Sequence, residues 1–173
     1  VGPAHVSIVI GSQAYEPICR EFNKPIVISG FEPLDILHSI LMLIRQLNEK
    51  RCAVEIQYSR AVSTNGNLIS QQVTQEIFEV RDTFEWRGLG FIADSALKIN
   101  ERYAAFDAEK RFQLPQTQGV EHKQCECSSV LRGVKKPMDC KLFAKACTPE
   151  NPLGSCMVSS EGACAAVYAY GRV

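Results

Sequence analysis

Six of the eight cysteines in this chain of 173 residues lie within its last 49 residues, and this concentration constrains the fold of that segment strongly. The segment has few aliphatic residues, so there is little hydrophobic core in which its cysteines would be buried as ordinary side chains. Cysteine concentrated in this way indicates one local chemistry, and a metal ion or an iron–sulfur cluster is the first hypothesis. The residues concerned are Cys125, Cys127, Cys140, Cys147, Cys156 and Cys164.

The spacing of these cysteines fits a structural zinc site poorly. Such sites take thiolates or imidazoles in pairs with two to four residues between them, whereas Cys125 and Cys127 have only one residue between them. An iron–sulfur cubane accepts thiolates from distant parts of the chain, and loops rich in proline and glycine suit such wrapping. Spacing alone does not select four ligands from six candidates.

Charge and hydropathy exclude several classes of partner. Lysine and arginine together number 19, as do aspartate and glutamate, so the chain has no net positive charge that would attract nucleic acid or an anionic membrane. The longest apolar stretch, residues 34–47, is too short and too polar to span a bilayer. No secretory signal pattern opens the sequence, which favours reduced thiols over disulfides. We therefore expect a soluble, cytoplasmic protein without nucleic-acid or membrane partners, and the valine at its start indicates a fragment or a processed chain.

The first two thirds of the chain alternate between strand and helix patterns. Continuous apolar runs at residues 6–10, 24–30 and 52–58 predict strands, and residues 12–21 predict a helix between the first two. The clearest helix covers residues 33–47, because it opens on a proline and repeats apolar residues at three- and four-residue steps. Short connections between these elements predict an α/β fold with a parallel sheet flanked by helices.

The rest of the pattern predicts two domains. Further helices are expected at residues 68–80 and 95–112, followed by a linker at residues 114–119. Beyond the linker, a sustained period appears only in a short alanine-rich helix near the C-terminus. We therefore predict an α/β domain over residues 1–118 and a small loop-rich cysteine module over residues 119–173.

Four positions outside the cysteine module invite a functional interpretation. Cys19 and Cys52 lie far from the other cysteines and are interpreted as small buried hydrophobic residues. Arg60 follows a predicted strand, where open parallel sheets place ligand contacts, although a structural ion pair is the favoured interpretation. Glu32 stands at a strand-to-helix turn and is interpreted as a helix cap in preference to an interface residue.

Several blocks of the sequence are typical of one protein family. The most specific is CMVSSEGACAA at residues 156–166. The others are GFEPLD at residues 30–35, QYSR at 57–60, WRGLG at 86–90, YAAFDAE at 103–109 and CTPE at 147–150. On these blocks, which cover almost the whole chain, the sequence closely resembles the HypD family of hydrogenase maturation factors.

The resemblance implies a scaffold on which an iron atom receives cyanide and carbon monoxide ligands before delivery to a [NiFe]-hydrogenase. It implies a HypC-type chaperone and a HypE-type cyanide donor as partners. It also implies a [4Fe–4S] cluster in a redox role. Cys127 and Cys156 would then be nearby thiols, either redox partners or supports for the ligands. The family's ligand spacing falls here on Cys125, Cys140, Cys147 and Cys164.

The resemblance extends only to the C-terminal half of the family protein. The family's GPGCPVC segment and its iron-binding cysteine belong to an N-terminal α/β domain that this sequence lacks. The resemblance therefore implies that this chain does not build the Fe(CN)2CO centre alone. In addition, Ser128 follows Cys127 where the family usually has glycine.

Two other functions remain open on the residues themselves. One is a thiol–disulfide oxidoreductase that uses Cys125 with Cys127 or Cys156, and the other is a zinc-stabilised interaction module. The leading expectation is a redox-active assembly scaffold rather than a conventional enzyme.

Overall fold

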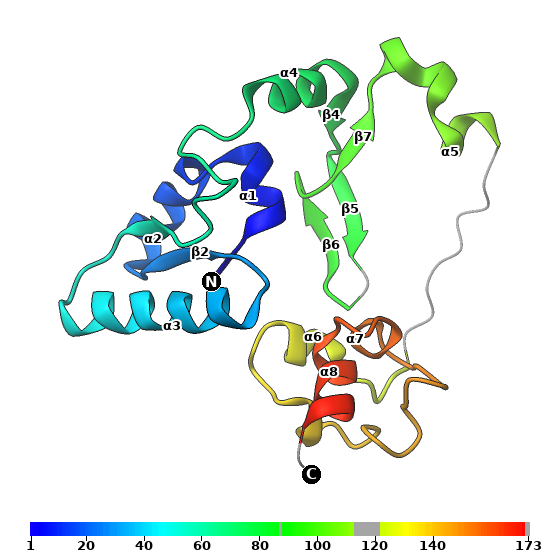
Figure 1. Ribbon diagram of the computed structural model, residues 1–173. Helices are drawn as coiled ribbons and strands as arrows, with labels where there is room; N and C mark the ends of the chain where they lie inside the picture. The colour runs from blue at the N-terminus through cyan, green and yellow to red at the C-terminus, as the bar shows by residue number, and fades with distance from the viewer. Residues whose placement is uncertain (87, 113–121, 172–173) are drawn as a thin grey trace. The chain divides into compact units, whose positions relative to one another are not determined.

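The computed structural model describes residues 1–86, 88–112 and 122–171, and the chain divides into two compact units, Val1–Ile77 and Phe78–Val173 (Figure 1). The first unit contains a parallel sheet with helices, and the second contains two antiparallel strand pairs and the cysteine-rich segment. The predicted domain boundary between residues 118 and 119 lies outside the described residues, as does the predicted linker.

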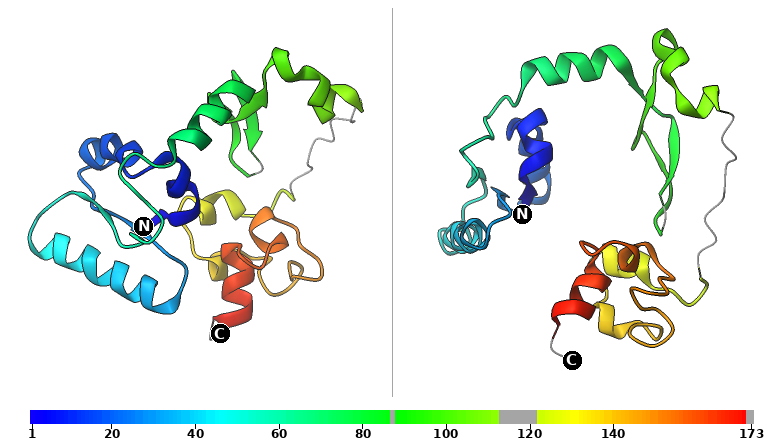
Figure 2. Two further views of the ribbon diagram at one scale, coloured as in Figure 1. Left: turned by 45° about the horizontal axis from the view of Figure 1, so that its top comes forward. Right: turned by 45° about the vertical axis from the view of Figure 1, so that its right-hand side comes forward.

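The sheet of the first unit is parallel, and its three strands run in the order β1, β2, β3, so the predicted α/β class is confirmed. Val27 and Ile28 on the central strand are completely buried. Helices α1 and α3 both contact β2 (Figure 2). The strands are β1 (Gly2–Pro3), β2 (Ile26–Ser29) and β3 (Val54–Ile56), and the helices are α1 (Ala4–Ile10), α2 (Glu16–Phe22), α3 (Pro33–Asn48) and α4 (Leu68–Ile77), with a 3-10 turn η1 (Gln13–Tyr15) before α2.

Residues 6–10 belong to a helix, so the strand predicted there is wrong. Strand β1 is confined to Gly2 and Pro3, and α1 begins directly after it. Ala4 and Ser7, one turn apart, face the core, and the Ser7 hydroxyl donates a hydrogen bond to the Pro3 carbonyl oxygen (2.6 Å). A short apolar run does not by itself distinguish a buried strand from a helix. Here the buried residues, Ala4 and Ser7, are three positions apart, which is the spacing of one face of a helix.

The helix predicted at residues 33–47 is present as α3, but its apolar stripe is exposed. Leu34, Leu37 and Leu47 are 77%, 63% and 61% exposed. The fully buried residues of α3 are polar and hydrogen-bonded within the unit: the Ser39 hydroxyl donates to the Asp35 carbonyl oxygen (2.8 Å) and the Gln46 side-chain oxygen accepts from the Ala53 backbone N–H (2.9 Å). Helix α3 is therefore held in part through polar contacts.

Residues 78–99 form two antiparallel strand pairs that the sequence pattern did not predict. Strand β4 (Phe78–Val80) pairs with β7 (Leu97–Ile99), and β5 (Thr83–Trp86) pairs with β6 (Gly90–Ala93) between them. Gly90, at the start of β6, has a positive φ of 77°, a conformation that glycine adopts without steric cost.

Two helices predicted from the sequence are wrong in part, because these strands occupy some of their residues. The helix expected at residues 68–80 ends at Ile77, where β4 begins. The helix expected at residues 95–112 is replaced by β7, the 3-10 helix η2 (Glu101–Phe106) and the short helix α5 (Ala108–Arg111). Pairing between β4 and β7 joins residues about 20 positions apart, and it outweighs the local helical spacing of apolar residues.

The cysteine-rich segment is rich in loops, as predicted, and its helices are short. They are α6 (Cys127–Leu131), η3 (Pro137–Asp139), α7 (Ser155–Val158) and α8 (Ala163–Tyr170). Helix α8 confirms the short helix predicted near the C-terminus.

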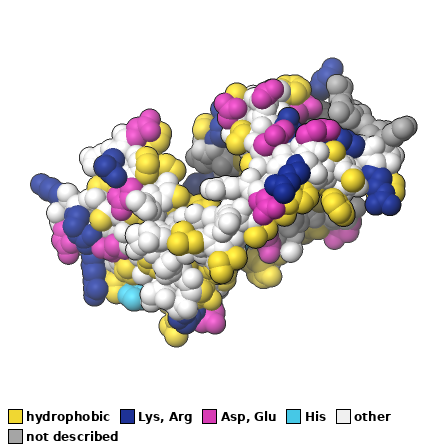
Figure 3. Space-filling view, turned by 90° about the horizontal axis from the view of Figure 1, so that it is seen from above, with side chains coloured by type: hydrophobic (Ala, Val, Ile, Leu, Met, Phe, Trp, Pro, Cys, Tyr) yellow, Lys and Arg dark blue, Asp and Glu magenta, His cyan; other side chains and the backbone are white. Residues whose placement is uncertain are grey.

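The surface carries charges of both signs. On the face that Figure 3 shows, acidic and basic side chains are interspersed with hydrophobic ones. Among the residues that the structure describes, no helix is both long enough and apolar enough to span a membrane.

Candidate functional site

The clustered cysteines pack into one small core. Cys127, Cys147, Cys156 and Cys164 are all less exposed than 8%, at 6%, 6%, 4% and 7% respectively. The remaining two, Cys125 and Cys140, are half-buried and pack against the same core. All four predicted ligands therefore lie in or against one core, to which they come from separate loops and helices. The other buried members of this core are Val130, Leu142, Phe143, Met157 and Ala165.

Three cysteine sulfurs lie especially close together. The Sγ atoms of Cys156 and Cys164 are 3.0 Å apart. The Sγ of Cys127 accepts a hydrogen bond from the backbone N–H of Cys156 (3.3 Å) and lies 3.1 Å from the Ser155 hydroxyl. Cys156 is thus in direct contact with the predicted ligand Cys164, and Cys127 is in direct contact with Cys156. The sequence interpretation left both Cys127 and Cys156 outside the ligand set.

The segment from Leu153 to Cys156 organises these sulfurs through its backbone. The N–H of Leu153 donates a hydrogen bond to the Sγ of Cys147 (3.4 Å), as the N–H of Cys156 does to Cys127. Between them, Gly154 has no room for a side chain, because a Cβ there would lie 2.5 Å from the Sγ of Cys125. The sequence interpretation did not assign a role to this segment, and only the close approach of the backbone to the sulfurs reveals it.

Burial raises the pKa of the Cys125, Cys156 and Cys164 thiols. For Cys156, hydrogen bonding with Cys127 and Cys164 raises the pKa further. These groups therefore hold their protons at neutral pH, and a metal that they bind must displace those protons. A metal would therefore bind this core more favourably as the pH rises.

The cysteines share a core without converging on a single point. Among the described residues, no group of three or more histidine, cysteine, aspartate or glutamate side chains is placed to hold one metal ion. The core thus brings many thiols together but does not arrange them as a tetrahedral single-ion site.

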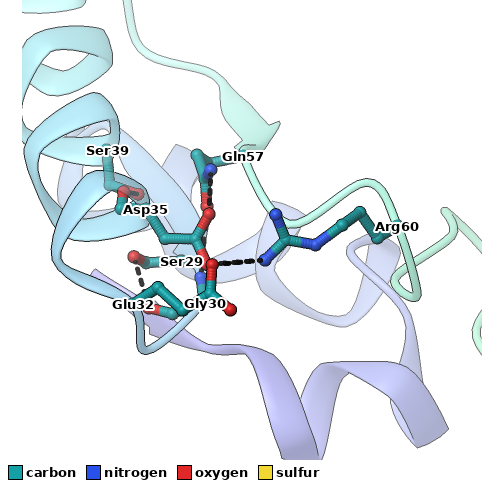
Figure 4. Close-up of polar contacts among 7 residues, drawn as sticks. All are labelled: Ser29, Gly30, Glu32, Asp35, Ser39, Gln57 and Arg60. Carbon is teal, nitrogen blue, oxygen red and sulfur yellow. Dashed lines mark hydrogen bonds and ion pairs between the residues drawn. The ribbon is translucent and has the colours of Figure 1, made fainter.

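A second candidate site, made of polar side chains, lies where β2 and β3 end. The carboxylate of Asp35, on a residue only 4% exposed, accepts hydrogen bonds from the Gln57 side-chain amide (2.8 Å) and the Arg60 guanidinium (2.7 Å) (Figure 4). The Gln57 side-chain oxygen accepts a hydrogen bond from the Gly30 backbone N–H (3.2 Å). These contacts, with the Gln57 amide first, hold the pKa of Asp35 below its usual range, and the bond to Asp35 raises the pKa of Arg60. The site joins both strand ends to α3.

The surroundings of this site explain two residues singled out in the sequence. The Arg60 guanidinium lies over the Tyr58 ring, 4.6 Å from its centroid, so the interpretation of Arg60 as an ion-pair residue is confirmed. Glu32 occupies the N-cap position of α3, as predicted, but its side chain accepts no capping hydrogen bond. Its carboxylate instead lies 3.6 Å from Arg60. A side chain at Gly30 would collide with both Asp35 and Tyr58.

Replacing Asp35 by asparagine is expected to lower the melting temperature by several degrees at pH 7 and to change its dependence on acid. Because the pKa of Asp35 is lower in the folded chain than the roughly 3.9 of an unfolded one, its contacts stabilise the fold above about pH 4. This contribution is lost as the pH falls through the folded-state pKa. Thermal melts of wild type and variant between pH 7 and pH 3 measure the difference.

The matched control is Asp82→Asn, because the Asp82 side chain is exposed. It is expected to leave the melting temperature within about 1 °C of the wild type at pH 7, as surface substitutions usually do. Equal effects of the two substitutions would contradict the assigned role of Asp35.

Comparison with known proteins identifies the family. The family model HypD, described as "Hydrogenase formation hypA family", matches residues 1–171. The hydrogenase maturation factor HypD of Azotobacter vinelandii is 62% identical over 172 residues, which are 99% of this chain and 45% of that protein. The factor of the same name from Cupriavidus necator is 60% identical over 172 residues, with the same coverage. The one from Escherichia coli is 44% identical over 170 residues, 98% of this chain and 46% of that protein.

These matches cover nearly the whole chain. The chain in turn spans about 45% of the length of the curated relatives it matches. The blocks that carried the resemblance include residues of both sites described above. GFEPLD and QYSR contain Gly30, Asp35, Gln57 and Arg60, and CTPE and CMVSSEGACAA contain Cys147, Cys156 and Cys164. This chain belongs to the HypD family of hydrogenase maturation factors.

Proposed function

We propose that this chain is the cluster-bearing part of a scaffold for [NiFe]-hydrogenase maturation, and that Cys125, Cys140, Cys147 and Cys164 ligate a [4Fe–4S] cluster. The observation that carries the proposal is the packing of these four cysteines, from four separate segments, into or against one core. The family supplies the biological role, since its members are hydrogenase maturation factors.

The residues of the core suit a polynuclear cluster. Cubane ligands bind different iron atoms, so their sulfurs can come from separate segments of the chain, as the sulfurs of these four cysteines do. The sulfur of Cys147 already accepts a backbone N–H, and hydrogen bonds of this kind stabilise a thiolate and tune the potential of a cluster that it holds. When bound, such a cluster supplies one-electron transfer.

The remaining steps of maturation need further polypeptide. We propose that the Fe(CN)2CO centre is assembled only with the part of the family protein that lies outside this chain, and with a HypC-type chaperone and a HypE-type cyanide donor. The chain's coverage of about 45% of its relatives supports this division. The exposed stripe of α3, which includes Leu34, Leu37 and Leu47, also supports it, because large exposed apolar surfaces are typical of contacts with another polypeptide.

A thiol–disulfide oxidoreductase is the second candidate. The 3.0 Å approach of the Cys156 and Cys164 sulfurs favours a dithiol at this position. However, a thiol that exchanges with a protein partner has to be reached by it, and Cys127, Cys156 and Cys164 are all buried, which leaves the half-buried Cys125 as the more accessible thiol of the predicted pair. The cluster scaffold therefore remains the better-supported function.

Anaerobic reconstitution with ferrous iron and sulfide tests the cluster. We expect about four irons and four sulfides per chain and the brown absorbance of a [4Fe–4S] protein, with an EPR signal on reduction. Stoichiometric zinc without sulfide would support the zinc-stabilised module instead. A colourless protein without iron, with full exchange activity that depends on Cys127 and Cys156, would establish the oxidoreductase.

A further inference from the structure

Two cysteines outside the cysteine-rich segment lie directly against each other. The Sγ atoms of Cys19 and Cys52, 33 residues apart in sequence, are separated by 2.7 Å. Cys19 is on α2 and 2% exposed, whereas Cys52 precedes β3 and is half-buried. The sequence interpretation treated both as isolated hydrophobic residues and gave no sign that they meet.

The backbone on both sides of this pair is held in place. The Cys19 carbonyl oxygen accepts hydrogen bonds from the Lys24 N–H (3.3 Å) and from the Cys52 thiol (3.1 Å). Next to Cys52, the Ala53 N–H donates to Gln46 (2.9 Å), and the Ala53 carbonyl oxygen accepts from the Ile26 N–H (3.1 Å). The two sulfurs are therefore positioned by the end of α2 on one side and by the start of the sheet on the other.

We propose that Cys19 and Cys52 form a reversible disulfide when the chain meets a low-molecular-weight disulfide such as oxidised glutathione. The Cys52 thiolate attacks one glutathione sulfur, forms a mixed disulfide and releases one glutathione thiolate. The Cys19 thiolate then attacks the Sγ of Cys52 and releases the second. Both protein thiols lose their protons to the released thiolates, so the protein is oxidised by two electrons and two reduced glutathione molecules are formed.

The order of these steps follows from exposure. Cys52 is half-buried whereas Cys19 is buried, so the external disulfide meets Cys52 first. Burial, reinforced by the contact with Cys52, raises the pKa of Cys19 to about 11, which leaves Cys19 protonated at neutral pH and unsuited to the first attack. The sulfurs then need to approach by less than about 1 Å, because a disulfide bond is about 2.05 Å long.

The disulfide would close a loop that contains β2 and α3, the central strand and the longest helix among the described residues of the first unit. Closing a loop of this length restricts the unfolded chain, so the cross-linked unit is expected to melt at a higher temperature. This site uses none of the six cysteines of the proposed cluster, and its outcome is independent of cluster binding.

Peptide mapping after oxidation tests the proposal. The intact chain is incubated anaerobically with oxidised glutathione, free thiols are blocked with N-ethylmaleimide, and the protein is digested with trypsin. Cleavage after Arg20, Arg51 and Arg60 gives two peptides whose only cysteines are Cys19 and Cys52. We expect these peptides to be cross-linked in most molecules, with a melting temperature roughly 5 °C or more above the reduced chain and full reversal by dithiothreitol.

The variants Cys19→Ala and Cys52→Ala distinguish the two thiols. With Cys19→Ala, glutathione is expected to remain attached at Cys52, because the second thiol is absent. With Cys52→Ala, no glutathione is expected at Cys19. The proposal is overturned if wild-type Cys19 and Cys52 remain separate under these conditions, or if the two variants take up glutathione equally at the remaining cysteine.

Discussion

Substitution of Cys147 by serine is expected to abolish cluster binding, from about four irons per reconstituted chain to less than one. Cys147 is 6% exposed and its sulfur accepts the Leu153 N–H, so the side chain is fixed in the core. A serine hydroxyl is not a thiolate and does not replace the iron–sulfur bond. Iron and sulfide analysis after anaerobic reconstitution, together with the absorbance spectrum, measures the loss.

Cys156→Ser is the matched control, because Cys156 is buried to a similar degree (4% exposed) but lies outside the proposed ligand set. Both substitutions remove one buried sulfur, so their effects on packing should be similar. We expect the Cys156→Ser chain to retain most of its iron and its colour. If it loses iron as completely as Cys147→Ser does, the ligand set proposed here is wrong.

Substitution of Met157 by alanine is expected to destabilise the cysteine core by about 2–5 kcal/mol. Met157 is 1% exposed and belongs to the same buried cluster as Cys127, Cys147, Cys156 and Cys164. Truncating its side chain removes buried surface and leaves a cavity that short helices and loops fill poorly. Alkylation of the cysteines with iodoacetamide along a urea series measures this local unfolding, because a buried thiol reacts only when its core opens.

The neighbouring residue gives the control for this measurement. Val158 is 58% exposed, so Val158→Ala should change the midpoint of cysteine alkylation little. Equal shifts for Met157→Ala and Val158→Ala would show that Met157 does not anchor the core.

The elements that the sequence predicted correctly have strong local patterns. Strand β2, helix α3 and strand β3 follow from apolar runs and from a helical repeat that opens on Pro33. Helix α8 follows from an alanine-rich stretch. The strand pairs β4–β7 and β5–β6 were missed, because their stability comes from pairing between residues that no local period connects.

The orientation of α3 shows a second limit of sequence patterns. A helical repeat of leucine and isoleucine predicts an apolar face, and that face exists, but Leu34, Leu37 and Leu47 are exposed. What the first unit buries from this helix is Asp35, Ser39 and Gln46. The hydrogen-bonding partners that make this burial favourable, such as Gln57 and the Ala53 N–H, lie beyond α3 in the chain and are invisible to its periodicity.

For the cysteine core, the sequence by itself determined the number and type of the sulfur atoms, the loop-rich character of their segment and, through its motifs, the family. Only the tertiary structure decided which sulfurs meet: Cys156 with Cys164 in the core, and Cys19 with Cys52 far from it. The physical reason is that composition and spacing are properties of neighbouring residues. A contact between two sulfurs depends on the whole path of the backbone that brings them together.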